Sequence, residues 1–201
     1  MTADTANAPR QPHEGHDIPG DSGVWFFIIA DMCAFAVFFL VFMAGRAQAP
    51  QVYETSRTML DLRFGLANTL ILLTSGAFMA QAAREAQKAQ WQRARLMMIA
   101  TLVTGLPFGV SKAMEWQAKL AHGVGLTTNE FFTYYFIFTG VHFLHFVIGI
   151  VVLLVLIGMA EKPGVAEDKR LRWIESGGAY WHMVDLPWIV LFAMLYLMRA
   201  A

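Results

Sequence analysis

The chain has 201 residues, of which 57% are hydrophobic and 15% are charged, and equal numbers of acidic and basic side chains give a formal net charge of zero. The hydrophobic residues are too many and too contiguous for a soluble domain of this size, so we expect an integral membrane protein without a soluble catalytic domain. A neutral chain also lacks the basic surface with which proteins bind nucleic acid, and no nucleic-acid partner is expected.

Five apolar blocks are each long enough to cross a hydrocarbon core as a helix, which takes roughly 20 residues. They cover residues 23–45, 65–83, 96–113, 131–159 and 177–198. Barrel strands are excluded, because the blocks lack the alternation over roughly ten residues that a membrane strand requires. The sequence therefore predicts an all-α membrane protein, a five-transmembrane-helix bundle that forms one domain over residues 23–201.

The segments outside the blocks predict the tail and the orientation. Residues 1–22 combine three prolines with scattered charges, a composition that cannot bury a core, and we expect a flexible cytoplasmic tail. The connections, of about 19, 12, 17 and 17 residues, leave no room for a second domain. Nine Lys and Arg residues fall on the side of the tail and six on the other, which favours a cytoplasmic amino terminus and a periplasmic carboxyl terminus.

Five ionisable side chains fall inside the predicted spans and away from their ends, where an unpaired charge costs about 3 kcal/mol. They are Asp31, His142, His145, His182 and Asp185. With a rise of about 1.5 Å per residue, four of them come to nearly one depth in the cytoplasmic half of the bilayer. His142 lies one turn nearer the midplane. We therefore expect a buried polar cluster on three helices.

Three roles for this cluster stay open: hydrogen bonding between helices, a titrating or conformational role, and a bound metal or haem. Haem is disfavoured, because His142 and His145 share one face of a helix and cannot both ligate the same iron, which leaves only His182 to pair with either. No signature of a metal cluster is present. We expect no catalytic residue, no metal site and no redox centre.

Other polar and small residues have structural interpretations. Glu115, beside Trp116 and Lys112, falls near the outer end of the third span and is expected to anchor that end at the membrane interface. Asn68 and Thr69 are expected to hydrogen-bond within the bundle, as are Thr74 and Ser75. A strip of small residues predicts close packing inside the bundle or against a partner: Gly140, Gly149, Gly177 and Gly178.

Two motifs resemble subunit III of the haem-copper oxidases. One is Gly-Val-His-Phe-Leu-His-Phe-Val-Ile-Gly at residues 140–149, and the other is Glu175 followed by Tyr-Trp-His-Met-Val-Asp-Leu-Pro-Trp at residues 180–188. The resemblance covers roughly residues 20–199. Full-length subunit III has seven helices, and this chain looks like the last five. The positions that match family landmarks are Asn68, Glu115, Gly140, Gly149, Glu175, Tyr180, Trp181 and Trp188.

Two departures from the oxidase form narrow the resemblance to one branch of the family. Ala30-Asp31 stands where many oxidase forms carry Ser-Glu, and residues 126–136 also look less like the oxidase form. Both are similar to the short branch associated with bacterial nitric oxide reductase, usually called NorE.

The resemblance implies a noncatalytic accessory subunit beside a haem-bearing catalytic subunit in the bacterial cytoplasmic membrane. It implies no redox cofactor, and membrane lipid, as a structural phospholipid, is the expected ligand. The first interpretation is a subunit that supports nitric oxide reductase in denitrification. The alternative is subunit III of a respiratory cytochrome c or quinol oxidase. A small proton or solute transporter is a second alternative, disfavoured because no inverted repeat is visible.

Overall fold

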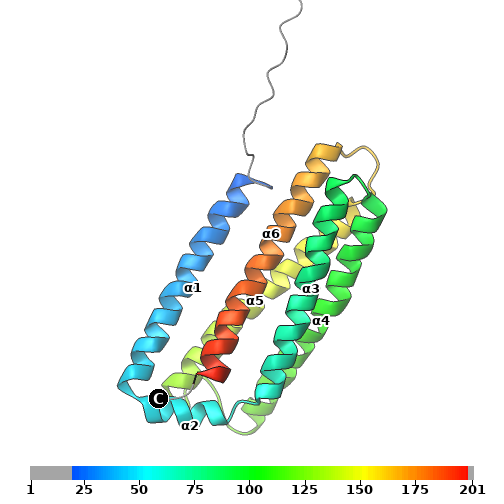
Figure 1. The fold of residues 1–201 in the computed structure, drawn as a ribbon. Helices are drawn as coiled ribbons and strands as arrows, with labels where there is room; N and C mark the ends of the chain where they lie inside the picture. Colours follow the sequence, from blue (N-terminus) through cyan, green and yellow to red (C-terminus); the bar gives the residue numbers. More distant parts are fainter. Residues whose placement is uncertain (1–19, 199–201) are drawn as a thin grey trace, which may run out of the picture.

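The computed structural model describes residues 20–198 and is helical over most of that range (Figure 1). The predicted tail over residues 1–22 lies almost wholly outside the described residues. The helices are α1 (Ser22–Gln48), α2 (Pro50–Thr58), α3 (Leu62–Gln87), α4 (Trp91–Ala121), α5 (Glu130–Met159) and α6 (Glu167–Phe192), and a π-helical turn, Ala193–Leu197, continues α6.

Five of these helices are long and apolar enough to cross a membrane: α1, α3, α4, α5, and α6 with its π-helical turn. They coincide with the five predicted spans, which confirms the helical class and the expected number of spans within residues 20–198. The helices run beyond the predicted limits. α4, for example, continues to Ala121, well past residue 113, because backbone hydrogen bonding does not stop where the apolar block ends.

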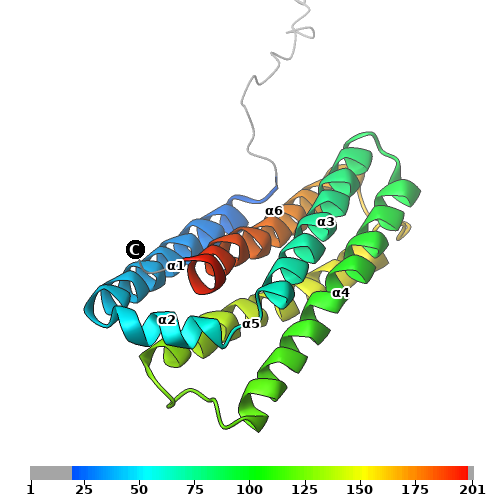
Figure 2. The same cartoon turned by 60° about the horizontal axis from the view of Figure 1, so that its bottom comes forward.

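One helix was not expected. The predicted connection of about 19 residues after the first span contains α2, which crosses the lower end of the bundle in Figures 1 and 2. Tyr53 of α2 packs against Phe42 of α1 and Phe131 of α5, with ring centroids 5.0 and 5.7 Å apart. Burial raises the pKa of the Tyr53 phenol, and the Glu130 carboxylate raises it further, so the hydroxyl stays protonated. Hydropathy could not reveal a polar helix of nine residues.

α6 is the central helix of the bundle. Of the apolar stretch with which α6 can cross a membrane, 67% is buried inside the bundle. The corresponding share for α1 is 17%. α6 packs against α3, α5 and α1, while α4 packs mainly on α3 (Figure 2). The indole rings of Trp181 and Trp188 on α6 are almost completely buried. α1 therefore lies on one side of α6, and the α3–α4 pair lies on the other.

The surface of the bundle is apolar, in contrast to a soluble protein. Phe26 and Leu40 on α1 are 77% and 70% exposed, and Val103 and Val110 on α4 are each 61% exposed. Polar side chains such as Lys112 are buried instead. This distribution is what a lipid environment favours, because hydrocarbon solvates aliphatic groups and leaves polar groups to pair inside the protein.

Candidate functional site

Asp31 on α1 and His145 on α5 form a carboxylate–imidazole pair inside the bundle. His145 Nε2 lies 3.4 Å from Asp31 Oδ1, and the two side chains are only 13% and 11% exposed. The rings of Phe27 and Phe35 lie against the imidazole, and Tyr180 of α6 donates a hydrogen bond of 3.2 Å to the His145 carbonyl oxygen. The pair thus joins α1 to α5, in addition to ring contacts such as that of Phe38 with Phe138.

His182 and Asp185 form a second pair on α6, facing α3. His182 Nδ1 lies 3.4 Å from Asp185 Oδ2; the Asp185 side chain is 7% exposed, whereas that of His182 is 43% exposed. A Cβ atom at Gly76 of α3 would collide with the Asp185 carboxylate. Asp185 Oδ1 is buried and has no hydrogen-bond partner among residues 20–198. Gly76 therefore makes room for a carboxylate between α3 and α6.

His142 lies apart from both pairs. Its Nε2 atom is 2.8 Å from the carbonyl oxygen of Val184, and since a carbonyl can only accept, Nε2 carries the hydrogen. The rings of Phe108 and Trp188 pack around it at centroid distances of 5.7 and 5.3 Å. His142 therefore links α5 to α6 by a hydrogen bond, and aromatic rings enclose its imidazole.

The five expected residues thus occupy three places: one pair between α1 and α5, one pair between α6 and α3, and a separate histidine. No ion pair joins the first pair to the second in the part of the chain that the structure describes. Within the same residues, no three His, Cys, Asp or Glu side chains converge on a metal-sized site. Depth along a helix reveals which residues share a level, but it does not reveal which side of a helix they occupy.

A fully buried lysine inside the bundle was not expected. Lys112 of α4 is fully buried, and its Nζ atom donates to Glu115 Oε2 at 2.8 Å, to the Tyr135 hydroxyl at 3.1 Å and to the Tyr196 hydroxyl at 3.2 Å. Both hydroxyls donate to Glu115 Oε1 at 2.8 Å. The ammonium group also lies 5.1 Å from the centroid of the Trp188 ring. We call these four residues, Lys112, Glu115, Tyr135 and Tyr196, the lysine network.

The lysine network corrects the interpretation of Glu115 as an interface anchor. The Glu115 side chain is 6% exposed and joins α4 to α5 and to the π-helical turn after α6. The available signal was the spacing of Lys112 and Glu115, three apart on one helix face. Their tyrosine partners are distant in the sequence, since Tyr196 is 84 residues from Lys112.

A family model described as cytochrome c oxidase subunit III matches residues 18–200 of the chain. The chain belongs to the cytochrome c oxidase subunit III family. The resemblance inferred from the motifs is thereby confirmed at the level of the family. Among the relatives, cytochrome c oxidase subunit 3 of Thermostichus vulcanus is 29% identical over 194 residues, which cover 96% of this chain and 94% of the relative.

Two other relatives of this subunit III chain are informative. The cytochrome bo(3) ubiquinol oxidase subunit 3 of Pseudomonas aeruginosa is 26% identical over 205 residues, which cover 98% of this chain and 95% of the relative. The heme-copper oxidase subunit I+III of Aeropyrum pernix is 25% identical over 181 residues, which cover 88% of this chain but only 22% of the relative. The similarity in that case is to one part of a longer protein.

Glu175 of the subunit III motif ties three helices together at the end where α1 begins. It accepts hydrogen bonds from the Gly20 backbone N–H at 3.2 Å and from the Gln87 amide at 3.0 Å. The adjacent Ser176 hydroxyl accepts from the Asp21 backbone N–H at 2.9 Å. This part of the motif therefore fixes the start of α1 and the end of α3 on α6.

The tryptophans of the motif organise the packing of α6. A Cβ at Gly105 of α4 would lie 3.0 Å from the Trp181 ring, and one at Gly149 of α5 would lie 3.2 Å from it, so both glycines make room for the indole. Gly149 therefore faces the bundle interior. Trp188 Nε1 donates to the Thr69 hydroxyl of α3 at 3.1 Å.

The remaining small and polar residues differ in how closely other atoms surround them. A Cβ at Gly177 would collide with Leu156, so Gly177 lies inside the bundle, and one at Gly178 would meet Met79 at 3.5 Å. A Cβ at Gly140 would meet nothing within 4 Å. Asn68 is fully buried, but neither of its amide atoms has a partner among residues 20–198, so the hydrogen bond expected for it was wrong.

Proposed function

We propose that this chain is a noncatalytic accessory subunit of a respiratory haem-copper oxidase in a bacterial cytoplasmic membrane. The observation that carries this proposal is the subunit III family match over residues 18–200. The Aeropyrum pernix relative supports a catalytic partner, because its name joins subunits I and III and the chain matches only part of it. The role of the chain in this proposal is to stabilise the haem-bearing subunit and sustain its turnover.

An oxidase is the preferred partner, since the relatives are named as subunits of a cytochrome c oxidase and a ubiquinol oxidase. The length of the chain does not favour the nitric oxide reductase branch, because the Thermostichus vulcanus oxidase subunit matches over 94% of its own length. The resemblance keeps nitric oxide reductase as the second candidate, because Ala30-Asp31 and residues 126–136 look less like the oxidase form.

A phospholipid is the proposed ligand, and a surface cavity supports it. The cavity has a volume of about 410 Å³ and lies between α1, α5 and α6. Val151, Val152 and Val155 give it an apolar wall, while Asp21 and Ser176 line it at the end where α1 begins. Such a cavity suits an acyl chain with a polar headgroup at the membrane surface.

The experiment that tests the function is purification of the tagged chain in mild detergent from its native membranes. Mass spectrometry identifies the proteins recovered with it, and an absorption spectrum identifies their haems. Recovery of a copper-containing oxidase supports the proposal, whereas recovery of nitric oxide reductase subunits with b- and c-type haems supports the second candidate. A chain recovered alone and without colour argues against both, and in favour of a transporter.

Asp31→Asn is expected to loosen the attachment of α1 without unfolding the bundle. The amide keeps the shape of the side chain but not its charge, so we expect a loss of about 1 kcal/mol of stability. The melting temperature of the chain in detergent and the turnover of the recovered oxidase should both fall, while its haem content stays normal. Asp168→Asn, at an exposed position in the first turn of α6, is the matched control. Equal turnover in the two variants would sink the proposed role of the Asp31–His145 pair.

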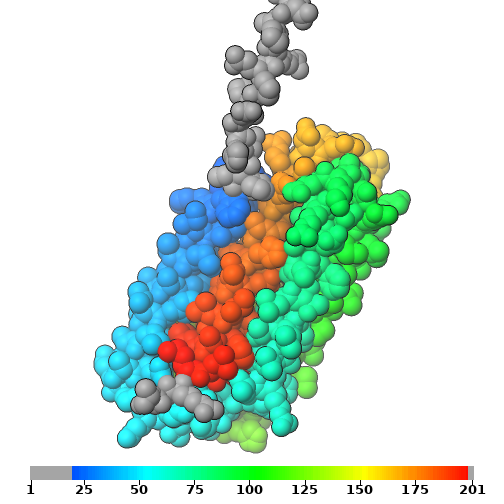
Figure 3. Space-filling view, in the orientation of Figure 1, coloured from blue at the N-terminus to red at the C-terminus, as the bar shows by residue number. Residues whose placement is uncertain are grey.

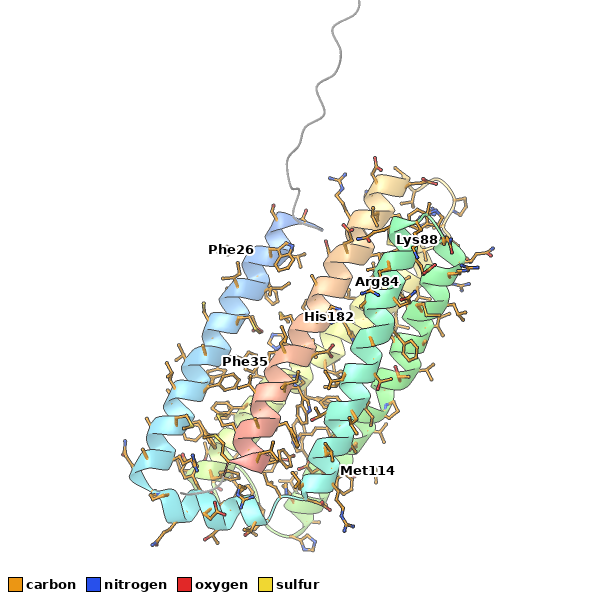
Figure 4. The ribbon with its side chains drawn as sticks, viewed as in Figure 1. Phe26, Phe35, Arg84, Lys88, Met114 and His182 are labelled. Carbon is orange, nitrogen blue, oxygen red and sulfur yellow. The ribbon has the colours of Figure 1, made fainter. Side chains whose placement is uncertain are left out.

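The charges at the two ends of the bundle predict its orientation. The end where α1 begins carries Arg84, Lys88, Arg93, Arg95, Lys162, Lys169, Arg170 and Arg172, and Figure 4 labels Arg84 and Lys88 there. The other end carries Arg46, Arg57, Arg63 and Lys119, while Lys112 lies in the lysine network. Counted over residues 20–198, eight against four favours a cytoplasmic location for the first end.

The orientation is testable with a membrane-impermeant maleimide. In a Cys33→Ser background, Thr127→Cys should be labelled in spheroplasts, because residue 127 lies between α4 and α5 at the end proposed to be periplasmic. Lys169→Cys, at the opposite end, should react only after lysis. The reverse pattern of labelling would overturn the proposed orientation.

A further inference from the structure

A groove runs along α6 between α1 and α3, and Figure 3 shows α6 exposed on its floor. Two adjoining cavities form it, with volumes of about 340 and 400 Å³. Ala80, His182 and Leu186 line both cavities. The α3 wall is built largely from small side chains, with Gly76 and Ala77 beside Ala80. We call this surface the α1/α6/α3 groove. Small residues along it allow another helix to approach closely.

The floor of the groove carries the His182–Asp185 pair. Figure 4 labels His182 on α6; its side chain is 43% exposed and lines both cavities. Asp185 Oδ1 is buried without a hydrogen-bond partner among residues 20–198. Both residues lie within a membrane-spanning segment. Hydrocarbon would offer this pair no hydrogen bonds, and an ionisable group at this depth normally faces protein or water.

We propose that the α1/α6/α3 groove is the docking surface for a transmembrane helix of the catalytic subunit, which places a hydrogen-bonding side chain against the His182–Asp185 pair. The proposal rests on the proposed function and specifies its interface. A lipid acyl chain could fill the apolar walls, but it would offer no hydrogen bond to the exposed imidazole of His182. A helix with one polar side chain satisfies both the walls and the floor.

The outward face of α4 provides an internal comparison. It lies on the far side of α3 from α1 in Figures 1 and 2, and it exposes Val103 and Val110. Aliphatic side chains of this kind are well solvated by lipid. This face therefore serves as the control surface for the groove.

The test is photocrosslinking in the intact complex. The photoreactive amino acid p-benzoylphenylalanine is placed at Leu186 or Leu73 in the groove, and at Val103 or Val110 on the control face. The groove positions are expected to crosslink to the catalytic subunit, and the control positions to lipid alone. In parallel, Leu186→Trp should reduce the recovered catalytic subunit by at least about tenfold, whereas Val103→Trp should leave it unchanged.

Each result has a distinct meaning. Crosslinks to the catalytic subunit from the α4 face alone would overturn the groove as the interface while leaving the proposed function intact. Crosslinks from the groove to a second copy of the chain, or to lipid alone, would also overturn it. If the unmodified chain recovers no catalytic subunit at all, the proposed function fails, and the inference fails with it. The crosslinking positions keep the test valid even where Leu186→Trp does not fold.

Discussion

Glu115→Leu is expected to destabilise the chain more than any other single substitution considered for it. The change removes the carboxylate that holds Lys112 Nζ at 2.8 Å and that accepts hydrogen bonds from Tyr135 and Tyr196. The ammonium group would keep only two phenol oxygens as partners, and both phenols would lose their acceptor. Breaking a buried ion pair costs about 3–5 kcal/mol, because one charge is left without compensation.

Two further variants separate charge from packing. Lys112→Met should cost somewhat less, because the two tyrosines still donate to the Glu115 carboxylate. The double change Lys112→Met with Glu115→Leu should recover much of the loss, since no buried charge remains. Recovery of folded protein from membranes and the melting temperature in detergent measure each effect.

Lys88 and Glu85 supply the matched control for the lysine network. They are also three residues apart, at the end of α3, and lie 3.4 Å apart, but the Lys88 side chain is 61% exposed. Lys88→Met should therefore cost less than about 1 kcal/mol. Similar melting temperatures for Lys112→Met and Lys88→Met would contradict the view that the lysine network holds α4, α5 and the end of α6 together.

Much of this architecture could be predicted from the sequence, because a bilayer imposes a length and a composition on any helix that crosses it. All five spans met that requirement. α2 does not meet this requirement, because it has only nine residues, is polar on the outside and lies at the end of the bundle. The ends of the spans were also misjudged, because α4 continues through charged residues such as Arg93 and Lys119.

The candidate site was less predictable, because its geometry depends on the rotation of each helix. The sequence placed Asp31 and His145 at one depth, and the structure brings them within 3.4 Å. It also placed His182 and Asp185 at that depth, but they face α3 instead. Lys112 was assigned to the membrane interface, because nothing near it in the sequence indicates the tyrosines that surround it.

Gly76→Ala is expected to have the second largest effect, through the collision of one methyl group with the Asp185 carboxylate. The contact between α3 and α6 would have to widen, or the carboxylate would have to leave its place beside His182. Overpacking of this kind costs about 3 kcal/mol at the upper end of its usual range. The loss should appear as a lower melting temperature in detergent.

Gly140→Ala makes the same chemical change where no atom lies within 4 Å of the new Cβ. Alanine favours a helix over glycine by about 1 kcal/mol, so this control should be neutral or stabilising. Adding Asp185→Ala to Gly76→Ala should restore part of the lost stability, because the shorter side chain removes the collision, whereas adding Asp185→Asn should not. If asparagine rescues as well as alanine does, then charge rather than space sets the requirement for glycine at position 76, and the steric explanation of the α3–α6 contact is wrong.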